Sequence, residues 1–501
     1  MNRRAWIAPL VLALGLGGCD DLLTETPKSF LTTDNYYRTP ADIESATLSA
    51  YQPITRGDVW EWWLVIDMEL GSDAVRIHPD EPNFGTYHPG LFLWTPTDAS
   101  VSNPWNGFYT SIYRANLVLD KAPKVEFPDP QFRQELMAEA KFIRGYSYLM
   151  LTKLYDDVPL LLSVEDHEKA VGTPRTPVEQ VHAQVIQDLT EAERDLPEQP
   201  RAHGRASKAA AQMVLADLYQ WRSSFLKKDE WAKVAEYAQK VLASPQWGLL
   251  DDYLSVFLPA NKGNREVIWM VASSGVDGRT STNVSCHWLP RALGFNTAGG
   301  CEVLGQPTRW MYESFVEGDY RKEVSYRTSG CSTDPNIGCI TFDWPNVYKY
   351  RPSNNGVGGP SDVDFPLYRV AEAHLMLAEA LNEMGNTAEA IQHVNHIRAR
   401  ARKGNGSENR PEPADLPTTL TKEQAREAIY MERLWELAHE GKRWFDLVRR
   451  DALEPGYWRT SIENHDPEVA QRGDLSPHRK RFPIPAREIE LNPALTQNPG
   501  Y

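Results

Sequence analysis

Three tryptophans stand in turn-rich stretches of the sequence, each beside side chains that can donate or accept hydrogen bonds. They are Trp94 with Asp98 and Asn103, Trp288 with Asn283 and Arg291, and Trp344 with Asp343 and Asn346. A sugar ring presents C–H groups on one face and hydroxyls around its edge, so a flat indole beside polar groups suits it. We interpret the set as candidate contacts for a glycan or peptide ligand, although any one of these indoles could instead fill the core.

The sequence contains no recognisable catalytic motif. There is no G-x-S-x-G nucleophile elbow and no G-x-x-x-x-G-K-[ST] phosphate loop. The nearest approach to the zinc motif H-E-x-x-H is His439-Glu440, which continues with Gly441-Lys442-Arg443. We therefore predict a protein that is not an enzyme and assign no catalytic residue. A surface glycoside hydrolase is the enzymatic alternative, but a sequence cannot place its two carboxylates at the required separation.

The N-terminus has the features of an export signal. Arg3 and Arg4 precede the apolar run Ala5–Leu16, which is shorter than the roughly 20 residues of a membrane-spanning helix. The run ends in Leu16-Gly17-Gly18-Cys19, which is similar to a bacterial lipobox. We expect residues 1–18 to be removed and Cys19 to carry the lipid, since two or more acyl chains hold a protein on a membrane better than one. An ordinary signal peptide with an incidental cysteine is the alternative.

The other four cysteines lie close together in the middle of the chain, at Cys286, Cys301, Cys331 and Cys339. An exported chain meets an oxidising compartment, which favours disulfides, and four cysteines allow three connectivities. We predict Cys331 with Cys339 and Cys286 with Cys301, because short loops close easily. A zinc site of four thiolates is the alternative, although no C-x-x-C spacing occurs.

His393 and His396 are three residues apart in a helical stretch and could both face a metal ion. The sequence offers no third ligand beside them. We interpret them as part of a solvated helix face, and we predict no metal and no other cofactor.

The overall charge is acidic. The 501 residues include 53 Lys and Arg against 68 Asp and Glu, which gives a formal net charge of -15. This balance argues against a nucleic acid as partner and fits a soluble surface.

Helical periodicity dominates both ends of the chain. Leu367–Arg402 predicts two antiparallel helices joined at Gly385, and Arg205–Ala243 predicts a second such pair. Each resembles one tetratricopeptide (TPR) unit of about 34 residues, and one such hairpin cannot bury its apolar face alone. Further helices are predicted over Ala41–Tyr51, Trp60–Leu70, Trp105–Lys121, Pro130–Tyr155 and Val178–Leu196, with capping boxes at Thr176 and Thr421.

Charges of alternating sign follow Thr421 closely. They are Glu432, Arg433, Glu436, Glu440, Arg443 and Asp446. Because buried charges need partners, we predict that these side chains form structural ion pairs.

These patterns predict helical, TPR-like hairpins at both ends of the chain and a middle that is rich in loops. Residues 1–18 are the signal peptide, 19–250 an N-terminal helical part, 251–365 a loop-rich insert with four cysteines, and 366–501 a C-terminal helical part. We expect residues 19–501 to form one compact unit.

Six segments, ordered along nearly the whole chain, resemble the SusD/RagB family of outer-membrane lipoproteins. They are the lipobox with its polar leader, AEAKFIRGYSYLMLTKLYDDVPLL at Ala138–Leu161, GRASKAAAQMVLADLY at Gly204–Tyr219, LYRVAEAHLMLAEALN at Leu367–Asn382, ERLWELAHEGKRWFDLVRR at Glu432–Arg450 and RFPIPAREIELNPALTQNPGY at Arg481–Tyr501. The resemblance implies an all-α fold in which TPR-like helical hairpins form a scaffold and long irregular loops bind the ligand. It also implies a surface-exposed nutrient-binding lipoprotein that is not an enzyme. Such a protein covers a SusC-like TonB-dependent outer-membrane transporter and delivers oligosaccharides, or in some cases peptides, to it.

The resemblance does not identify the ligand contacts. The family's contacts lie in variable loops, so no binding residue carries over by motif, and Trp94 offers the nearest analogy in position. A TPR-type scaffold that binds proteins of the envelope is the non-enzymatic alternative.

Overall fold

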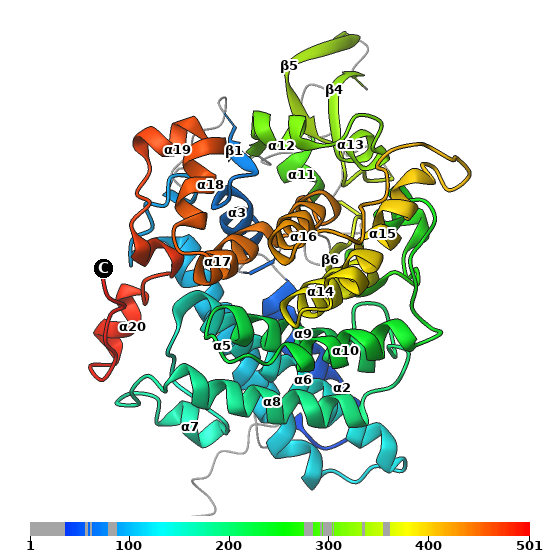
Figure 1. The fold of residues 1–501 in the computed structure, drawn as a ribbon. Helices are drawn as coiled ribbons and strands as arrows, with labels where there is room; N and C mark the ends of the chain where they lie inside the picture. The colour runs from blue at the N-terminus through cyan, green and yellow to red at the C-terminus, as the bar shows by residue number, and fades with distance from the viewer. Residues whose placement is uncertain are drawn as a thin grey trace, which may run out of the picture.

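The computed structural model describes residues 36–55, 59–60, 63–78, 88–274, 284–290, 293, 303, 305–332, 336–353 and 361–501. Helices make up most of these residues, and the strands among them form three short two-stranded sheets (Figure 1). The predicted helical fold is therefore confirmed. No described helix is both long and apolar enough to cross a membrane.

The N-terminal part is a set of paired helices. Its members are α2 (Pro40–Thr55), α3 (Trp63–Leu70), α5 (Ala99–Lys121), α6 (Pro130–Tyr155), α7 (Val164–Glu168), α8 (Val178–Asp195), α9 (Lys208–Ser224) and α10 (Trp231–Ala243). Helix α5 packs against α2 and α6, α6 packs against α8, and α9 packs against α10 (Figure 1). The pair formed by α9 and α10 is the TPR-like hairpin predicted over Arg205–Ala243.

The C-terminal part continues the same architecture. Its helices are α14 (Val370–Glu383), α15 (Thr387–Arg402), α16 (Lys422–Glu436), α17 (Arg443–Leu453), α18 (Tyr457–His465), α19 (Pro467–Arg472) and α20 (Ala486–Leu491). Gly385 turns the chain between α14 and α15 with a φ of 90°, a conformation that glycine adopts without strain. Helix α14 packs against α10 as well as α15, so the two helical parts share one hydrophobic core.

The middle of the chain supplies the strands and the short helices. Antiparallel pairs join β1 (Val75–Ile77) with β3 (Gly305–Pro307), β2 (Val267–Val271) with β6 (Phe365–Arg369), and β4 (Tyr326–Cys331) with β5 (Cys339–Val347). Between them lie α11 (Val284–Trp288), α12 (Arg309–Ser314) and α13 (Tyr320–Ser325). The β4–β5 ribbon projects from the helical body at the top of Figure 1. Short 3-10 turns occupy Ala122–Lys124, Leu254–Val256, Pro259–Asn261 and Pro477–Lys480.

Three local predictions were wrong in detail. Helix α5 begins at Ala99 and not at Trp105, because the helix accommodates Pro104 in its interior. Residues 367–369 belong to strand β6, so the predicted hairpin begins at Val370. Thr176 does not cap α8, because it pairs as a β-bridge with Val158, and Asp157 accepts the hydrogen bond from the Val178 backbone N–H instead (2.7 Å).

The predicted ion pairs are present and lie inside the protein. Glu436 is fully buried, and its carboxylate contacts the guanidinium groups of Arg369 (2.5 Å), Arg321 (3.2 Å) and Arg400. Although burial opposes ionisation, these three arginines hold the pKa of Glu436 well below its usual value. The carboxylate thus joins α16 to β6, α13 and α15.

Candidate functional site

An open recess lies where β1, α12, β5 and the α18–α19 junction meet, near the labels β1, α12 and α19 in Figure 1. Its volume is about 650 Å³, and its wall includes Arg76, Arg309, Trp310, Trp344, Asn464 and His465. We call it the Trp344 recess. Binding sites for small molecules typically have volumes of about 300–1,000 Å³, so this recess can take a sugar ring or more.

Trp344, on β5, is half-buried and held in a fixed orientation. Its indole N–H donates a hydrogen bond to the carbonyl of Pro307 at the end of β3 (2.8 Å). The guanidinium carbons of Arg76 and Arg309 lie 4.4 and 4.7 Å from the centre of the indole. The hydrogen bond and the two guanidinium groups fix the indole, and the guanidinium groups cover part of its ring.

Trp310, in the first turn of α12, provides a second flat surface. Its ring stacks on the imidazole of His465, with ring centres 3.6 Å apart and an angle of 5° between the planes. His465 Nδ1 in turn lies 3.4 Å from the carboxylate of Asp73. The stack therefore connects the recess to a buried charge.

Asp73 is fully buried and well partnered. Arg443 donates two hydrogen bonds to it, each 2.8 Å long, and Ser461 Oγ donates a third of 2.6 Å. Burial opposes ionisation, but Arg443 and the hydrogen-bonding side chains keep the pKa of Asp73 below its usual value. An ionised Asp73 thus supports the imidazole on which Trp310 stacks.

Polar groups surround these rings at the mouth of the recess. Arg309 and Glu313 are both mostly exposed, with a separation of 3.3 Å between guanidinium and carboxylate, and Asn464 is exposed beside His465. Flat rings with hydrogen-bonding groups at their edges match the two faces of a sugar. The geometry suits binding of a sugar without requiring any chemical step.

A second open groove lies between α5, α7 and α20. It has a volume of about 520 Å³, and its wall includes Trp105, Tyr109, Tyr113, Val171 and Leu491. Trp105 is buried and the hydroxyl of Tyr109 donates to the carbonyl of Pro159 (2.8 Å), so both rings are engaged with the protein. We call it the α5 groove and regard it as the weaker candidate.

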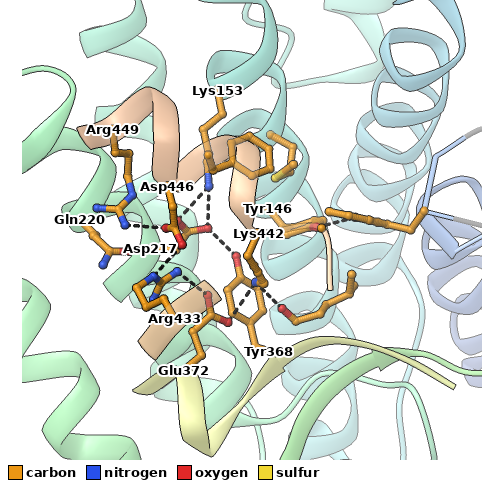
Figure 2. A pocket seen from close by; sticks show the side chains of 15 residues that line it. Tyr146, Lys153, Asp217, Gln220, Tyr368, Glu372, Arg433, Lys442, Asp446 and Arg449 are labelled. Atoms are coloured by element: carbon orange, nitrogen blue, oxygen red, sulfur yellow. Dashed lines mark hydrogen bonds and ion pairs between the residues drawn. The ribbon is translucent and has the colours of Figure 1, made fainter. Parts of the chain in front are cut away.

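A third cavity is small and lined by charged side chains (Figure 2). Lys153 and Tyr368 donate hydrogen bonds to the carboxylate of Asp217 (2.9 and 2.7 Å). Arg433 and Arg449 donate hydrogen bonds to the carboxylate of Asp446 (2.9 and 2.7 Å). The cavity measures about 20 Å³. A water molecule needs about 10–15 Å³ by this measure, so the cavity can hold water but no sugar.

The predicted tryptophans are distributed very differently. Trp344 lies in the recess, whereas Trp94 and Trp288 are each 1% exposed. Trp94 packs between Phe92 and Phe482, with ring centres 5.3 and 5.0 Å away, and Trp288 packs against His439 at 5.1 Å. In this structure neither indole offers a face to a ligand, because both belong to the core.

None of the predicted polar partners that the structure describes, Asp98, Asn103, Asp343 and Asn346, lines the recess. Asp98 accepts a hydrogen bond from the Thr95 backbone N–H (2.7 Å) and contacts His88 (3.0 Å), so it holds the chain ahead of α5. Asn283 and Arg291 lie outside the described residues. The sequence did not predict four residues that line the recess, namely Arg76, Arg309, Trp310 and His465. Of these four, only Trp310 had the feature by which the other tryptophans were chosen, an indole in a turn-rich stretch.

Of the predicted cysteine pairs, the structure contains the disulfide between Cys331 and Cys339, which closes the β4–β5 ribbon. Cys19, Cys301 and the side chain of Cys286 lie outside what the structure describes, so the second disulfide and the lipid anchor stay predictions.

The histidines predicted to form a helix face have a neighbour that the sequence did not indicate. His374 on α14 brings its Nδ1 within 3.1 Å of the Nδ1 of His393, and its ring lies 5.5 Å from that of His396. Among the described residues, no group of three or more His, Cys, Asp or Glu side chains is arranged to hold a metal ion.

Comparisons with known proteins identify the family. A family model described as "SusD family" matches residues 322–501, and one described as "Starch-binding associating with outer membrane" matches residues 90–220. SusD-like protein P2 of Formosa agariphila is 27% identical over 98% of both chains. Starch-binding protein SusD of Bacteroides thetaiotaomicron is 25% identical over 81% of this chain and 80% of its own.

The fold agrees with that result. The crystal structure of a SusD homolog from Bacteroides thetaiotaomicron superposes with a TM-score of 0.81 at 22% identity, covering 94% of this chain and 98% of the other. The two family models match segments in both helical parts, and SusD-like relatives align over nearly the whole chain. The chain therefore belongs to the SusD family.

Proposed function

We propose that this protein binds oligosaccharides at the Trp344 recess and delivers them to a SusC-like TonB-dependent transporter in the outer membrane. The observation that carries the proposal is the pair of flat aromatic surfaces, Trp310 and Trp344, in one open recess of about 650 Å³. Stacking on such rings buries the apolar face of a sugar, while the polar rim can bind its hydroxyls.

The relatives support this choice of ligand. One is named as a starch-binding protein, and one matching family model is described as starch-binding in association with the outer membrane. Membership of the SusD family also supports the transporter as partner, since the sequence resemblance implies a subunit that covers such a transporter.

Binding across a panel of ligands tests the proposal directly. We expect the purified protein to bind at least one oligosaccharide in isothermal titration calorimetry, with the sugar recovered intact. The panel should contain neutral glucan oligosaccharides, acidic oligosaccharides and short peptides. Binding to peptides alone would favour the interaction scaffold, and turnover abolished by one carboxylate substitution would favour the hydrolase.

The membrane anchor is a separate part of the proposal. The lipobox Leu16-Gly17-Gly18-Cys19 supports a lipid on Cys19, which would hold the protein at the surface of the outer membrane. In cells grown with labelled palmitate, we expect label in the wild-type protein and none in Cys19→Ala. Label that persists in the variant would refute the anchor.

A further inference from the structure

We propose that the oligosaccharide bound in the Trp344 recess is acidic, and that Arg76 and Arg309 bind a carboxylate or sulfate group on its sugar rings. This inference rests on the proposed function, because it names the class of ligand for the same recess. It follows from how the charges around Trp344 are partnered.

Arg76 forms no ion pair with a carboxylate among the residues that the structure describes, although its positive charge partly offsets the burial that raises the pKa of the nearby Asp466. It is the central residue of β1, opposite Gln306 of β3, and its guanidinium lies over Trp344. Its Nε is buried without a hydrogen-bond partner, and among the described residues its side chain forms no ion pair. A guanidinium carries five N–H donors in a planar fork, which matches a carboxylate or sulfate.

Arg76 is partly buried, and it differs from other packed arginines in its lack of side-chain hydrogen-bond partners among the described residues. Arg175 and Arg351, which are also partly buried and without an ion pair among the described residues, donate hydrogen bonds to backbone carbonyls. Arg321, Arg369, Arg443 and Arg449 are all buried and all make ion pairs with carboxylates. Because a desolvated cation is costly without a partner, the spare donors of Arg76 indicate that the partner is an anion that enters the recess.

Asp466 and Glu468, two of the three described carboxylates that line the recess, have partners at α19. Asp466 accepts hydrogen bonds from the backbone N–H groups of Glu468 and Val469 at the start of α19, and burial raises the pKa of Asp466. Glu468 pairs with Arg472 at 2.8 Å. Arg76 acts on Asp466 through its charge but forms no ion pair with Asp466 or Glu468, so its guanidinium can still bind an anion of the ligand.

Arg309 adds a second cation on the solvent side. Its side chain is 64% exposed, and its pair with Glu313 is 3.3 Å long and also exposed. Exposed pairs of this kind contribute little, so a ligand anion can displace Glu313 at small cost. The formal charge of -15 for the whole chain repels anions at a distance. Selectivity for an acidic glycan must therefore come from these two guanidinium groups at short range.

The test compares oligosaccharides of equal length by isothermal titration calorimetry. The probes are an oligogalacturonate for the carboxylate, a sulfated galactan oligosaccharide for the sulfate, and a neutral glucan oligosaccharide. We expect the wild type to bind one of the acidic probes about 10-fold or more tightly than the neutral one, since hydrogen bonds to charged groups are the stronger kind. We also expect this preference to fall as salt concentration rises.

Variants locate the preference. Arg76→Gln and Arg309→Gln should each reduce affinity for the acidic probe about 10-fold and leave the neutral probe nearly unchanged. Arg76→Lys should recover only part of the loss, because lysine keeps the charge but lacks the fork. Arg459→Gln is the matched control, since Arg459 is 62% exposed on α18 and pairs with Glu463 outside the recess.

The outcomes separate this inference from the proposed function. If the neutral probe binds as tightly as both acidic ones and Arg76→Gln changes nothing, the acidic-glycan inference is wrong while glycan binding stands. If no oligosaccharide binds the wild type, the proposed function fails and the inference fails with it. Because Arg309 is exposed, Arg309→Gln keeps the test decisive should Arg76→Gln fold poorly.

Discussion

Trp344→Ala is expected to weaken oligosaccharide binding by about 30-fold or more. Truncating a central aromatic contact typically costs about 2 kcal/mol or more, and 1.4 kcal/mol corresponds to a factor of ten in affinity. The indole is fixed by its hydrogen bond to Pro307, so the free protein already holds the ring in place. The Trp344 side chain therefore loses little conformational freedom when the sugar binds. Removal of the indole then removes the whole contact between this ring and the sugar. Calorimetry with the tightest oligosaccharide of the panel measures the effect.

Two further variants show whether the loss is specific. Trp310→Ala should also weaken binding, because it removes the second ring of the recess. Trp247→Ala is the matched control, since Trp247 is likewise partly buried against the core but does not line the recess. Equal affinity of the wild type and Trp344→Ala, with unchanged circular dichroism, would show that the sugar binds elsewhere.

Glu436→Ala is expected to cost about 3–5 kcal/mol of unfolding free energy, which is the usual loss when one partner of a buried ion pair is removed. The substitution leaves Arg369, Arg400 and Arg321 facing one another inside the core without the carboxylate between them. Urea unfolding at neutral pH measures the change. Glu427→Ala is the matched control on the same helix, because Glu427 is half-exposed and its pair with Arg450 is worth at most about 1 kcal/mol.

The same pair of proteins should respond differently to acid. The folded pKa of Glu436 lies below the ordinary value of 4.5, so the stability that its ionisation provides is complete above pH 4.5 and is lost as the pH falls below it. The difference between wild type and Glu436→Ala should therefore shrink on acidification, by at most about 1.4 kcal/mol per pH unit. A difference that stays constant from pH 7 to pH 3 would contradict the ion-pair account.

The sequence predicted the helical scaffold well, because the apolar residues of a helix recur at a spacing that is visible in the sequence. Helix α6 begins at Pro130 and ends at Tyr155, as predicted, because Asp129 accepts the hydrogen bond from the Gln131 backbone N–H and Pro130 fits the first helical turn. The alternating charges after Thr421 likewise predicted ion pairs, but not the partners Arg369 and Arg400, which come from other elements.

The site could not be predicted in the same way. Trp94, Trp288 and Trp344 all stand in turn-rich stretches, yet only tertiary packing determines that the first two face the core and the third faces a recess. The recess brings together Arg76 and His465, which are nearly four hundred residues apart in the sequence. No local sequence pattern predicts that two such distant residues lie close together. Long-range packing decides the site, whereas local patterns decide the helices.

The central claim is that the recess formed by Trp310 and Trp344 binds the oligosaccharide. The most direct measurement is a crystal structure of the protein soaked with the oligosaccharide that binds most tightly in the panel. The account predicts sugar rings lying against these two indoles, between β1 and α19. Sugar density in the α5 groove beside Tyr113, with the Trp344 recess empty, would contradict it.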